Sequence, residues 1–540
     1  MDLRRRFKVA VPAPAAGRVE VHRLVGERIV VQAAERGADG VWRLTFDEGD
    51  KDDLYWLSVD GAKAVLDPSA AQVRLTTDGP RGVVRTSWPR VPPLDARRAE
   101  PVIYELHVRG FGGTFDGVRR RLPYLADLGV DVIELMPVHP FDPDDSYWGY
   151  MPLVWGAVHE PYGRRDAVEE FAGLNRTAHG HGIEVWLDVV FNHTGEGDPR
   201  LPTYSLRGLP GVAWYRTDDN GRLTNDSGCG NDVNPSEPHV RRLILEALDR
   251  FADLGVDGFR FDLASLLTRD GGGLINEITA WARARGVRLV AEAWDMGAYM
   301  VGNPMWPPDW AQWNDRFRDD VRGFVRAEPG KVTSLARRLE GSPDLFGDRG
   351  PATTINFVTA HDGLTMHDLT IVTSDHHHSW DCGDELRPQM LRNYLTLLLL
   401  ATGAAMFVMG DEFARTQGGH DNPYDIDGPI SWVDWQRREE WEELHAFTRD
   451  LIELRRRCSR VPRDFMGVDG GPADWSHDSR ALAWRTDDLH VAANMWWEPL
   501  PCTAPPSSEW RQVIATAPWQ EGVLAPRSIV VWERKGYAPW

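Results

Sequence analysis

The feature that most constrains this 540-residue chain is an alternation of short apolar runs and longer amphipathic stretches between about residues 99 and 460. The runs have the length of buried strands, and apolar residues in the stretches between them recur every three or four positions, as in helices. Eight such runs separated by helices predict a (β/α)₈ barrel. We expect the strands at Val102–Leu106, Val132–Met136, Glu184–Phe191, Gly258–Leu263, Arg288–Glu292, Ala311–Asn314, Thr354–Thr359 and Met406–Met409.

The helices expected between these strands include Phe115–Leu128, His239–Leu254 and Leu386–Leu400, and a last one covers about residues 441–456. The alternative to a barrel is a doubly wound open sheet. Such a sheet would carry a glycine-rich turn after its first strand. The segment Gly110–Gly113 lacks the GxGxxG spacing, so the barrel is the favoured architecture.

Both flanks of the barrel have the short alternating runs of all-β domains. We predict an N-terminal β-sandwich over residues 1–98, a barrel over 99–460 and a C-terminal β-sandwich over 461–540, with a linker at Pro89–Pro93. The expected strands are Arg18–Leu24, Ile29–Ala33, Val41–Phe46, Tyr55–Val59 and Val73–Leu75 before the barrel, and Ala481–Arg485, Leu489–Met495, Trp510–Ile514 and Arg527–Trp532 after it.

Charge restricts the partners of this chain. Its 81 acidic and 61 basic side chains give a formal net charge of −20, without runs of basic residues. Nucleic acids and anionic membranes attract proteins through Lys and Arg, so neither is expected as a partner. A neutral ligand is favoured.

The cysteines and apolar segments indicate a cytoplasmic protein. Four cysteines are scattered without a CxxC pair, which suggests reduced thiols rather than a disulfide framework or a zinc site. Cys229 and Cys382 both fall in loops at the catalytic face, and whether they pair is left open. The opening residues lack a secretory apolar core, and Leu395–Met409 is interrupted and too short to span a membrane, so we expect a buried helix running into a buried strand.

Polar residues gather where the predicted barrel strands end. Chemistry in a barrel takes place at the carboxyl ends of the strands. Four of these ends are expected to converge on one cup. They carry Asp188, Asn192 and His193 on the third strand, Arg260 and Asp262 on the fourth, Glu292 and Trp294 on the fifth, and His361 and Asp362 on the seventh.

This set suits hydrolysis of a glycosidic bond with retention, which needs a carboxylate nucleophile and a carboxylic acid about 5–5.5 Å apart. Asp262 and Glu292, on neighbouring strands, fit these roles. Arg260 points to the same side of its strand as Asp262, and a cation there would keep Asp262 ionised and lower its pKa. Glu292 has fewer obvious cations nearby, so we expect it to stay protonated enough to act as the acid.

Two other interpretations of these residues remain. Each acid alone is equally compatible with a buried ion pair, although four strand ends fitting one site argue against that. A metal hydrolase would use Asp188, His193, Asp262 and His361 as ligands, but the chain lacks HxH and HExxH spacings. The run His376–His378 is interpreted as a solvated loop, because adjacent histidines in an extended segment cannot all face one metal.

The motifs at these positions resemble a known family. DVVFNH, GFRFDLAS, AEAWD and TAHDG resemble the four short regions of the α-amylase superfamily, glycoside hydrolase family 13. The likeness runs from about residue 100 to the end and is weaker in the N-terminal sandwich, whose counterpart is a glycogen-binding-type module. Further stretches resemble isoamylase-type glycogen debranching enzymes: YELHVRGF, YWGYMP, GCGNDVN, GDEFARTQGG, ISWVDW and NMWWEPL.

The resemblance implies a role for each site residue. Asp262 would be the nucleophile, Glu292 the general acid/base and Asp362 the stabiliser of the transition state. The subsite around the attacked glucose ring would be lined by Arg260, His193 and His361, with Tyr150 stacking beneath the ring. Residues 194–234 would form an irregular excursion that shapes the cleft. We also expect Trp294 to bind substrate, because aromatic faces stack on sugars.

The resemblance also implies which groups the enzyme does without. Family members of this type need no organic cofactor. Asn192 matches a calcium-linked position of amylases that debranching relatives do not generally use, so we predict no required metal. The expected partner is an α-glucan polysaccharide or oligosaccharide, and the oligomeric state is left open.

Three departures from the debranching pattern affect the regions beside the cleavage point. Ala293 replaces a usual proline, residues 419–423 replace an asparagine-rich run, and the loop at about residues 370–380 is shorter than in close relatives. The leading hypothesis is a retaining α-glucan hydrolase that cleaves α-1,6 branch points of glycogen or limit dextrin. The alternatives are a transglycosylase, a hydrolase of another α-glucoside and a non-catalytic glucan-binding protein, which the intact acids disfavour.

Overall fold

The computed structural model describes residues 7–46, 53–62, 64–95, 97–197 and 202–536. The first six residues of the predicted N-terminal sandwich and residues 198–201 of the predicted excursion lie outside this range. The chain forms two compact units. One contains the N-terminal sheets and barrel strands β12, β13 and β14, and the other contains β9, β16, β17 and the C-terminal sheets.

The eight predicted barrel strands form a closed parallel barrel in the order β10-β12-β13-β14-β15-β16-β17-β9. Closure by pairing of β17 with β9 confirms the predicted barrel and excludes the open sheet. Most of these strands are buried along their whole length, as expected for parallel strands covered on both faces. Their bounds are β9 Val102–Leu106, β10 Val132–Leu135, β12 Glu184–Val189, β13 Gly258–Phe261, β14 Arg288–Ala291, β15 Trp310–Asn314, β16 Thr354–Phe357 and β17 Ala404–Val408.

The helices follow the apolar spacing in the sequence. Helix α4 buries Val240, Leu243, Ala247 and Phe251 on one face, and Pro238 occupies its first turn, where a missing N–H costs nothing. The longer helices are α2 Phe115–Leu128, α3 Ala167–Gly180, α4 Pro238–Asp253, α5 Gly273–Arg285, α6 Asp315–Arg326, α7 Lys331–Leu339, α9 Arg387–Leu400 and α11 Glu442–Arg457, and the short ones are α1 Val108–Gly112, α8 Pro343–Phe346 and α10 Arg437–Glu440.

Helix α9 is buried on nearly all sides, and it leads into β17. Its residues from Met390 to Leu400 are almost all buried, so the expectation of a buried helix followed by a buried strand is confirmed. In the described part of the chain, none of the helices has both the length and the apolar character needed to cross a membrane.

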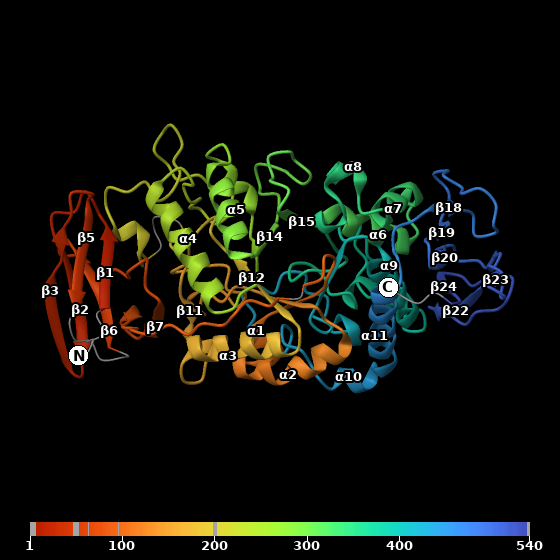
Figure 1. Ribbon diagram of the computed structural model, residues 1–540, viewed down its shortest axis with the longest axis horizontal. Coiled ribbons are helices and arrows are strands. Elements are labelled where there is room, and N and C mark those ends of the chain that lie inside the picture. The colour runs from red at the N-terminus through yellow and green to blue at the C-terminus, as the bar shows by residue number, and fades with distance from the viewer. Residues whose placement is uncertain (1–6, 47–52, 63, 96, 198–201, 537–540) are drawn as a thin grey trace. The chain divides into compact units, whose positions relative to one another are not determined.

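Two sheets form the N-terminal region, whose strands β1, β2, β5 and β6 stand side by side in Figure 1. The three-stranded sheet has the order β1-β5-β4 and the six-stranded sheet the order β11-β7-β8-β6-β2-β3. The strands are β1 Phe7–Pro12, β2 Val19–Val25, β3 Arg28–Ala33, β4 Glu35–Arg36, β5 Val41–Phe46, β6 Leu54–Val59, β7 Gln72–Thr76, β8 Gly79–Val83 and β11 Val158–His159.

Strand β11 is an addition that the sequence analysis did not foresee. It belongs to the loop after β10, yet it pairs in parallel with β7. The ion pair between Arg74 and Glu160, with Nη2 and Oε1 2.7 Å apart, supports the same contact. The six-stranded sheet therefore includes residues from beyond position 98.

The C-terminal region is all-β, as predicted in the fold class. Its five-stranded sheet has the order β18-β19-β20-β24-β22, beside a β21-β23 pair. The core between them includes Trp510, Leu524 and Trp532. The strands are β18 Asp464–Met466, β19 Ala481–Arg485, β20 Leu489–Asn494, β21 Leu500–Pro501, β22 Trp510–Ala515, β23 Val523–Leu524 and β24 Ser528–Arg534.

A buried acid links β9, α2 and the turn that follows β17. The hydroxyls of Tyr104 and Tyr124 donate to Oε1 of Glu412, at 2.9 and 2.6 Å. Burial raises the pKa of Glu412 from 4.5 to about 7. The folded chain therefore holds this proton over a pH range in which the unfolded chain has lost it.

We predict that Glu412→Gln makes stability less dependent on pH. A raised acid pKa contributes stability that is complete below pH 4.5 and is lost as the pH rises through about 7. Glutamine keeps an acceptor for both tyrosines without the charge, so at pH 8 the variant should exceed the parent by on the order of 3 kcal/mol in free energy of unfolding. Urea unfolding at pH 4.5 and pH 8 measures this. The exposed Glu439→Gln is the control, and equal pH dependence of parent and Glu412→Gln would contradict the prediction.

Candidate active site

One guanidinium, that of Arg260 on β13, organises the predicted site residues of the first compact unit. Its Nη1 lies 2.8 Å from Oδ2 of Asp188 and 3.1 Å from Oδ1 of Asp262. Its Nη2 lies 3.2 Å from Oε2 of Glu292. Only 1% of the Arg260 side chain is exposed, against 12% for Asp262 and 8% for Glu292. Burial alone would lower the pKa of Arg260, but Asp188 and Glu292 raise it well above its usual value.

Strand register explains why these groups meet. Asp188 and Arg260 are directly opposed in the β12–β13 pair, and Arg260 is opposed to Val290 in the β13–β14 pair. Residues two positions apart in a strand share a face. Asp262 and Glu292, each two positions further on, are therefore brought to the side where the Arg260 guanidinium lies.

One expectation about Glu292 is wrong. The sequence suggested few cations near this acid, whereas Arg260 forms an ion pair with Glu292 as well as with Asp262. The reason is the length of the arginine side chain, whose two terminal nitrogens reach acids on two strands. The predicted contact between Arg260 and Asp262 is present.

A network of hydrogen bonds holds Asp262 from the other side. Nδ2 of Asn192 donates to Oδ2 of Asp262 at 2.8 Å, so Oδ1 of Asn192 faces Nδ1 of His193 at 2.5 Å. The other ring nitrogen of His193 lies 2.6 Å from the carbonyl oxygen of Tyr150. Both neighbours accept, so both ring nitrogens of His193 carry protons and the ring is cationic.

The pKa of His193 agrees with this geometry. Burial alone would lower it, but Cys229, Asp262 and the Tyr150 carbonyl together raise it to about 9. Both ring nitrogens of His193 are thus engaged as donors, so this side chain offers no lone pair to a metal ion. This argues against His193 as one of the ligands of the metal-hydrolase interpretation.

A strained turn follows Asp262. Leu263 has φ of 40° and ψ of 47°, which lie in the left-handed region that residues other than glycine rarely adopt. This turn aims the Leu263 N–H at Oε2 of Glu292, which accepts at 2.7 Å. Oε2 of Glu292 is therefore held by a backbone donor as well as by Arg260. Strain of this kind costs about 1–3 kcal/mol and clusters at functional sites.

Tyr150 and the excursion contact the residues around Arg260 and Asn192. The Tyr150 hydroxyl donates to Oδ2 of Asp188 at 2.5 Å. At the base of the excursion, the Val233 N–H donates to the Asn192 carbonyl at 2.8 Å, and Nδ2 of Asn231 donates to the Thr194 carbonyl at 3.0 Å. The motif GCGNDVN thus closes the excursion beside Asn192.

The remaining predicted residues, His361 and Asp362, belong to the other compact unit and are described by themselves. Nδ1 of His361, which follows β16, lies 2.8 Å from Oε1 of Glu105 on β9. Asp362 interacts with Arg318 of α6: burial opposes the charge of Arg318, but Asp319 and Asp362 raise its pKa. The sequence analysis missed Glu105 as a partner of His361. An acid inside the otherwise apolar run Val102–Leu106 is the signal that could have indicated it.

The loop that departs from the debranching pattern contacts the residue that follows Asp362. The Gly363 N–H, next to Asp362, donates to the Asp421 carbonyl at 2.7 Å. Asp368 accepts from the Gln417 and Gly419 N–H groups at 2.7 and 3.2 Å. Residues 417–421 therefore lie beside Asp362.

Trp294, the histidine run and the cysteines, which the sequence also singled out, are not among the contacts of Arg260 described above. Trp294 lies in the loop after β14, where its backbone bridges to Tyr299. His377 pairs with Asp421 and His378 with Glu328. All four cysteines are free thiols. Within the described ranges, no cluster of three or more His, Cys, Asp or Glu side chains is arranged to hold a metal ion.

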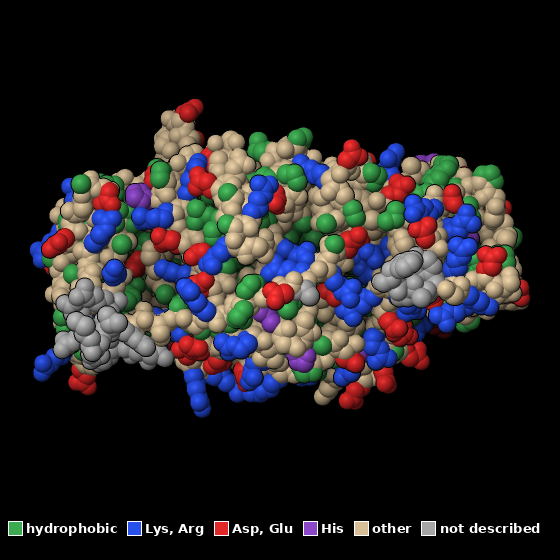
Figure 2. All heavy atoms as spheres, in the orientation of Figure 1, with side chains coloured by type: hydrophobic (Ala, Val, Ile, Leu, Met, Phe, Trp, Pro, Cys, Tyr) green, Lys and Arg blue, Asp and Glu red, His purple; other side chains and the backbone are tan. Residues whose placement is uncertain are grey.

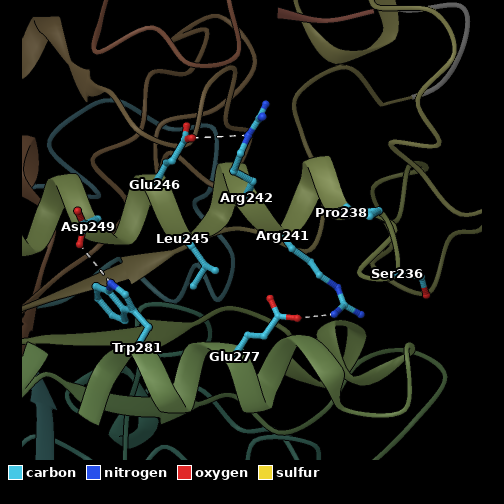
Figure 3. A pocket seen from close by; sticks show the side chains of 9 residues that line it. All are labelled: Ser236, Pro238, Arg241, Arg242, Leu245, Glu246, Asp249, Glu277 and Trp281. Carbon is cyan, nitrogen blue, oxygen red and sulfur yellow. Dashed lines mark hydrogen bonds and ion pairs between the residues drawn. The ribbon is translucent and has the colours of Figure 1, made fainter. Parts of the chain in front are cut away.

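A hollow of about 690 Å³ lies away from these residues, between α4 and α5 (Figure 3). Arg241 and Glu277 face each other across it, with Nη1 and Oε1 2.5 Å apart, and the Trp281 indole donates to Asp249 at 3.3 Å. Its charged groups thus compensate one another, and none of the predicted site residues lines it. Acidic and basic side chains are similarly intermingled over the face seen in Figure 2.

Comparison with known proteins identifies the family. The model of the α-amylase catalytic domain matches residues 44–201. The isoamylase of Flavobacterium sp. is 33% identical over an alignment of 538 residues. The match covers 78% of this chain and 69% of that protein. The chain belongs to the α-amylase superfamily, glycoside hydrolase family 13. The predicted resemblance to its isoamylase-type members is confirmed.

Two further comparisons extend this assignment. The glycogen operon protein GlgX homolog of Mycobacterium tuberculosis is 36% identical to this family member over 450 residues, 72% of this chain and 62% of that protein. A pullulanase from Anoxybacillus sp. LM18-11, solved with maltotetraose, superposes with a TM-score of 0.82 at 24% identity, over 98% of this chain and 86% of that one. The latter likeness establishes the fold. The chain spans about two thirds of the length of its curated relatives.

We predict that Arg260→Lys destabilises this family member. One ammonium cannot contact three carboxylates in the way a planar guanidinium does, so buried negative charge would remain uncompensated. The free energy of unfolding should fall by on the order of 2–3 kcal/mol in urea titrations. The control is Arg283→Lys, which alters an exposed pair with Asp309 and should leave stability unchanged. Equal effects of the two variants would refute the organising role of Arg260.

We predict a second pH effect from His193. Its folded pKa of about 9 exceeds the ordinary 6.5, so its contribution to stability is complete below pH 6.5 and is lost as the pH rises through about 9. The contribution is on the order of 3 kcal/mol. In His193→Gln the decline in unfolding free energy between pH 6.5 and 9.5 should flatten, whereas the exposed His181→Gln should keep the parental profile. An NMR titration showing a neutral His193 ring at pH 7 would contradict this.

Proposed function

We propose that this chain is a retaining α-glucan hydrolase that cleaves α-1,6 branch linkages of glycogen or limit dextrin. The observation that carries the proposal is the contact of one guanidinium with both Asp262 and Glu292. That contact keeps two carboxyl groups on one side of neighbouring strands, as attack by one and proton donation by the other require. Relatives named isoamylase and glycogen operon protein support the choice of linkage and substrate.

Asp262 is proposed as the nucleophile. Arg260 pairs with its Oδ1 and Asn192 donates to its Oδ2, so each oxygen of this carboxyl group has a donor. These donors also hold the side chain in place, which lowers the entropic cost of attack on the anomeric carbon. The attack forms a covalent glycosyl-enzyme intermediate, which water then hydrolyses.

Glu292 is proposed as the general acid and then the general base. Its Oε2 already accepts from Leu263 and lies near Arg260, so the transferable proton belongs on Oε1. In the first step this proton passes to the leaving glycosidic oxygen. In the second step the carboxylate takes a proton from the attacking water.

The other predicted site residues are proposed as substrate contacts. Asp362 stabilises the oxocarbenium-like transition state, and His361, held by Glu105, donates to a sugar hydroxyl. The cationic His193 and Arg260 are likewise proposed as contacts of the attacked glucose ring. Tyr150, fixed through its hydroxyl, offers a ring face for stacking, and Trp294 supplies a further aromatic surface.

The N-terminal sheets are proposed to buttress the excursion that shapes the cleft. The Leu66 N–H donates to the Tyr204 carbonyl at 2.7 Å, and the Ser205 hydroxyl donates to the Leu66 carbonyl at 2.9 Å. The division into regions 1–98, 99–460 and 461–540 is also proposed. In this division, the six-stranded sheet of the first region includes strand β11 from the second region. A cytoplasmic site of action, where glycogen is stored, is likewise proposed.

The proposal predicts a specific product pattern. The purified protein should release short linear chains from phosphorylase limit dextrin and leave maltoheptaose intact, as followed by chromatography. Disproportionation of maltoheptaose into shorter and longer chains would instead indicate the transglycosylase, and Ala293 and residues 419–423 would then be the positions to vary. Failure with both substrates would refute debranching.

Two variants separate the catalytic roles within the same assay. Asp262→Asn should lose activity on every substrate by at least about 10³-fold, because no covalent intermediate forms. Glu292→Gln should lose activity on limit dextrin but retain much of the first step on α-maltosyl fluoride, because fluoride leaves without a proton. The exposed Asp464→Asn is the matched control. Equal losses of Glu292→Gln on both substrates would contradict the acid role.

A further inference from the structure

A second cluster of charge lies at the opposite end of β9 from Glu105. It surrounds a pocket of about 250 Å³ formed by the segment before β9, the turn before β10 and the end of α11. These are amino-terminal ends of barrel strands, whereas barrel chemistry takes place at the carboxyl ends. The charged side chains that line the pocket are Arg98, Glu100, Asp131, Arg455, Arg456 and Arg460.

The pocket has four guanidinium groups but only two carboxylates. Both carboxylates also bind the barrel backbone: Oε2 of Glu100 accepts from the Gly403 N–H at 3.0 Å, and Oδ2 of Asp131 accepts from the Val102 N–H at 2.9 Å. Asp131 also forms ion pairs with Arg98 and Arg456, and Glu100 forms one with Arg460. The local balance is therefore positive, in a chain whose net charge is −20.

Arg455 is a buried cation whose hydrogen bonds go to carbonyl groups. Its Nη1 donates to the carbonyls of Leu399 and Ala401 at 2.8 and 3.0 Å, and its Nη2 donates to that of Gly403. Burial lowers its pKa to about 9, Arg460 adds to that effect, and Glu100 and Asp131 offset it only in part. Carbonyl dipoles do not neutralise a buried charge, so a nearby anion would be stabilising.

Arg460 leaves one donor unused. Its Nη1 donates to the Arg455 carbonyl at 2.9 Å and its Nη2 pairs with Glu100. Its Nε is buried and has no hydrogen-bond partner among the described residues. A buried N–H without an acceptor costs about 1–3 kcal/mol, which a bound acceptor oxygen would offset.

We propose that this pocket binds a phosphate dianion, either free or as the terminal group of a sugar phosphate. Guanidinium groups match phosphate oxygens in a fork, and the charge of about −1.5 to −2 balances the excess of two positive charges among the side chains that line the pocket. The volume is slightly below the usual range of about 300–1,000 Å³ for small-molecule sites, which limits the ligand to a phosphate with one sugar ring. The site is independent of the proposed catalytic activity.

Isothermal titration calorimetry tests the proposal with the whole chain. Inorganic phosphate and glucose 1-phosphate should both bind with one site per chain, and glucose should not. Tighter binding of glucose 1-phosphate identifies the sugar phosphate as the ligand, whereas equal affinities identify the bare anion. Binding should weaken as sodium chloride is added. No binding of either phosphate, or equal binding of glucose, would overturn the proposal.

Variants locate the binding in this pocket. Arg98→Ala and Arg456→Ala should each weaken phosphate binding by at least about tenfold, the loss of one charge-assisted hydrogen bond. The control is Arg449→Ala on the same helix as Arg456, which removes an exposed pair with Asp127, 3.7 Å apart. Arg98 is half-exposed, so its variant should fold even if Arg456→Ala does not. Unchanged affinity in Arg98→Ala and in any folded Arg456→Ala would overturn the assignment.

Discussion

The contact of Arg260 with Asp188, Asp262 and Glu292 is the interaction on which the candidate site depends. Three carboxylates on neighbouring strands would repel one another and lose hydration on burial. A single planar cation between them offsets this repulsion and loss of hydration. It also holds the two proposed catalytic acids on one side. Asn192 donates to the Asp262 oxygen that the guanidinium does not contact, and Tyr150 and Leu263 donate to the same oxygens of Asp188 and Glu292 that it pairs with.

The surroundings of this cluster are held by segments far apart in the chain. The excursion after β12 is closed at its base by contacts to Asn192 and Thr194. Its far side contacts the N-terminal region through Tyr204 and Ser205. Strand β11, from the loop after β10, extends a sheet of the same region. The N-terminal sheets therefore support the loops that carry Tyr150 and His193, whether or not they bind glucan.

Much of the site could be predicted because its residues occupy short, distinctive motifs at strand ends. Asp262, Glu292 and Arg260 were located from strand positions alone. The contact between Arg260 and Glu292 was missed, because it depends on register between two strands and on the reach of one long side chain. The pairing of Glu105 with His361 was missed for a related reason: the two residues are more than 250 positions apart and meet only when β9 joins the barrel.

The sequence by itself determined the barrel, the flanking β regions, the family and the identity of the acids, since these follow from periodic burial and from local motifs. The tertiary structure alone decided the ionic state of His193, the shared cation of Asp262 and Glu292, and the arginine pocket around Arg455 and Arg460. These depend on which charges are placed together in a buried environment. Electrostatic energy there varies with distance and desolvation, neither of which is written in the order of residues.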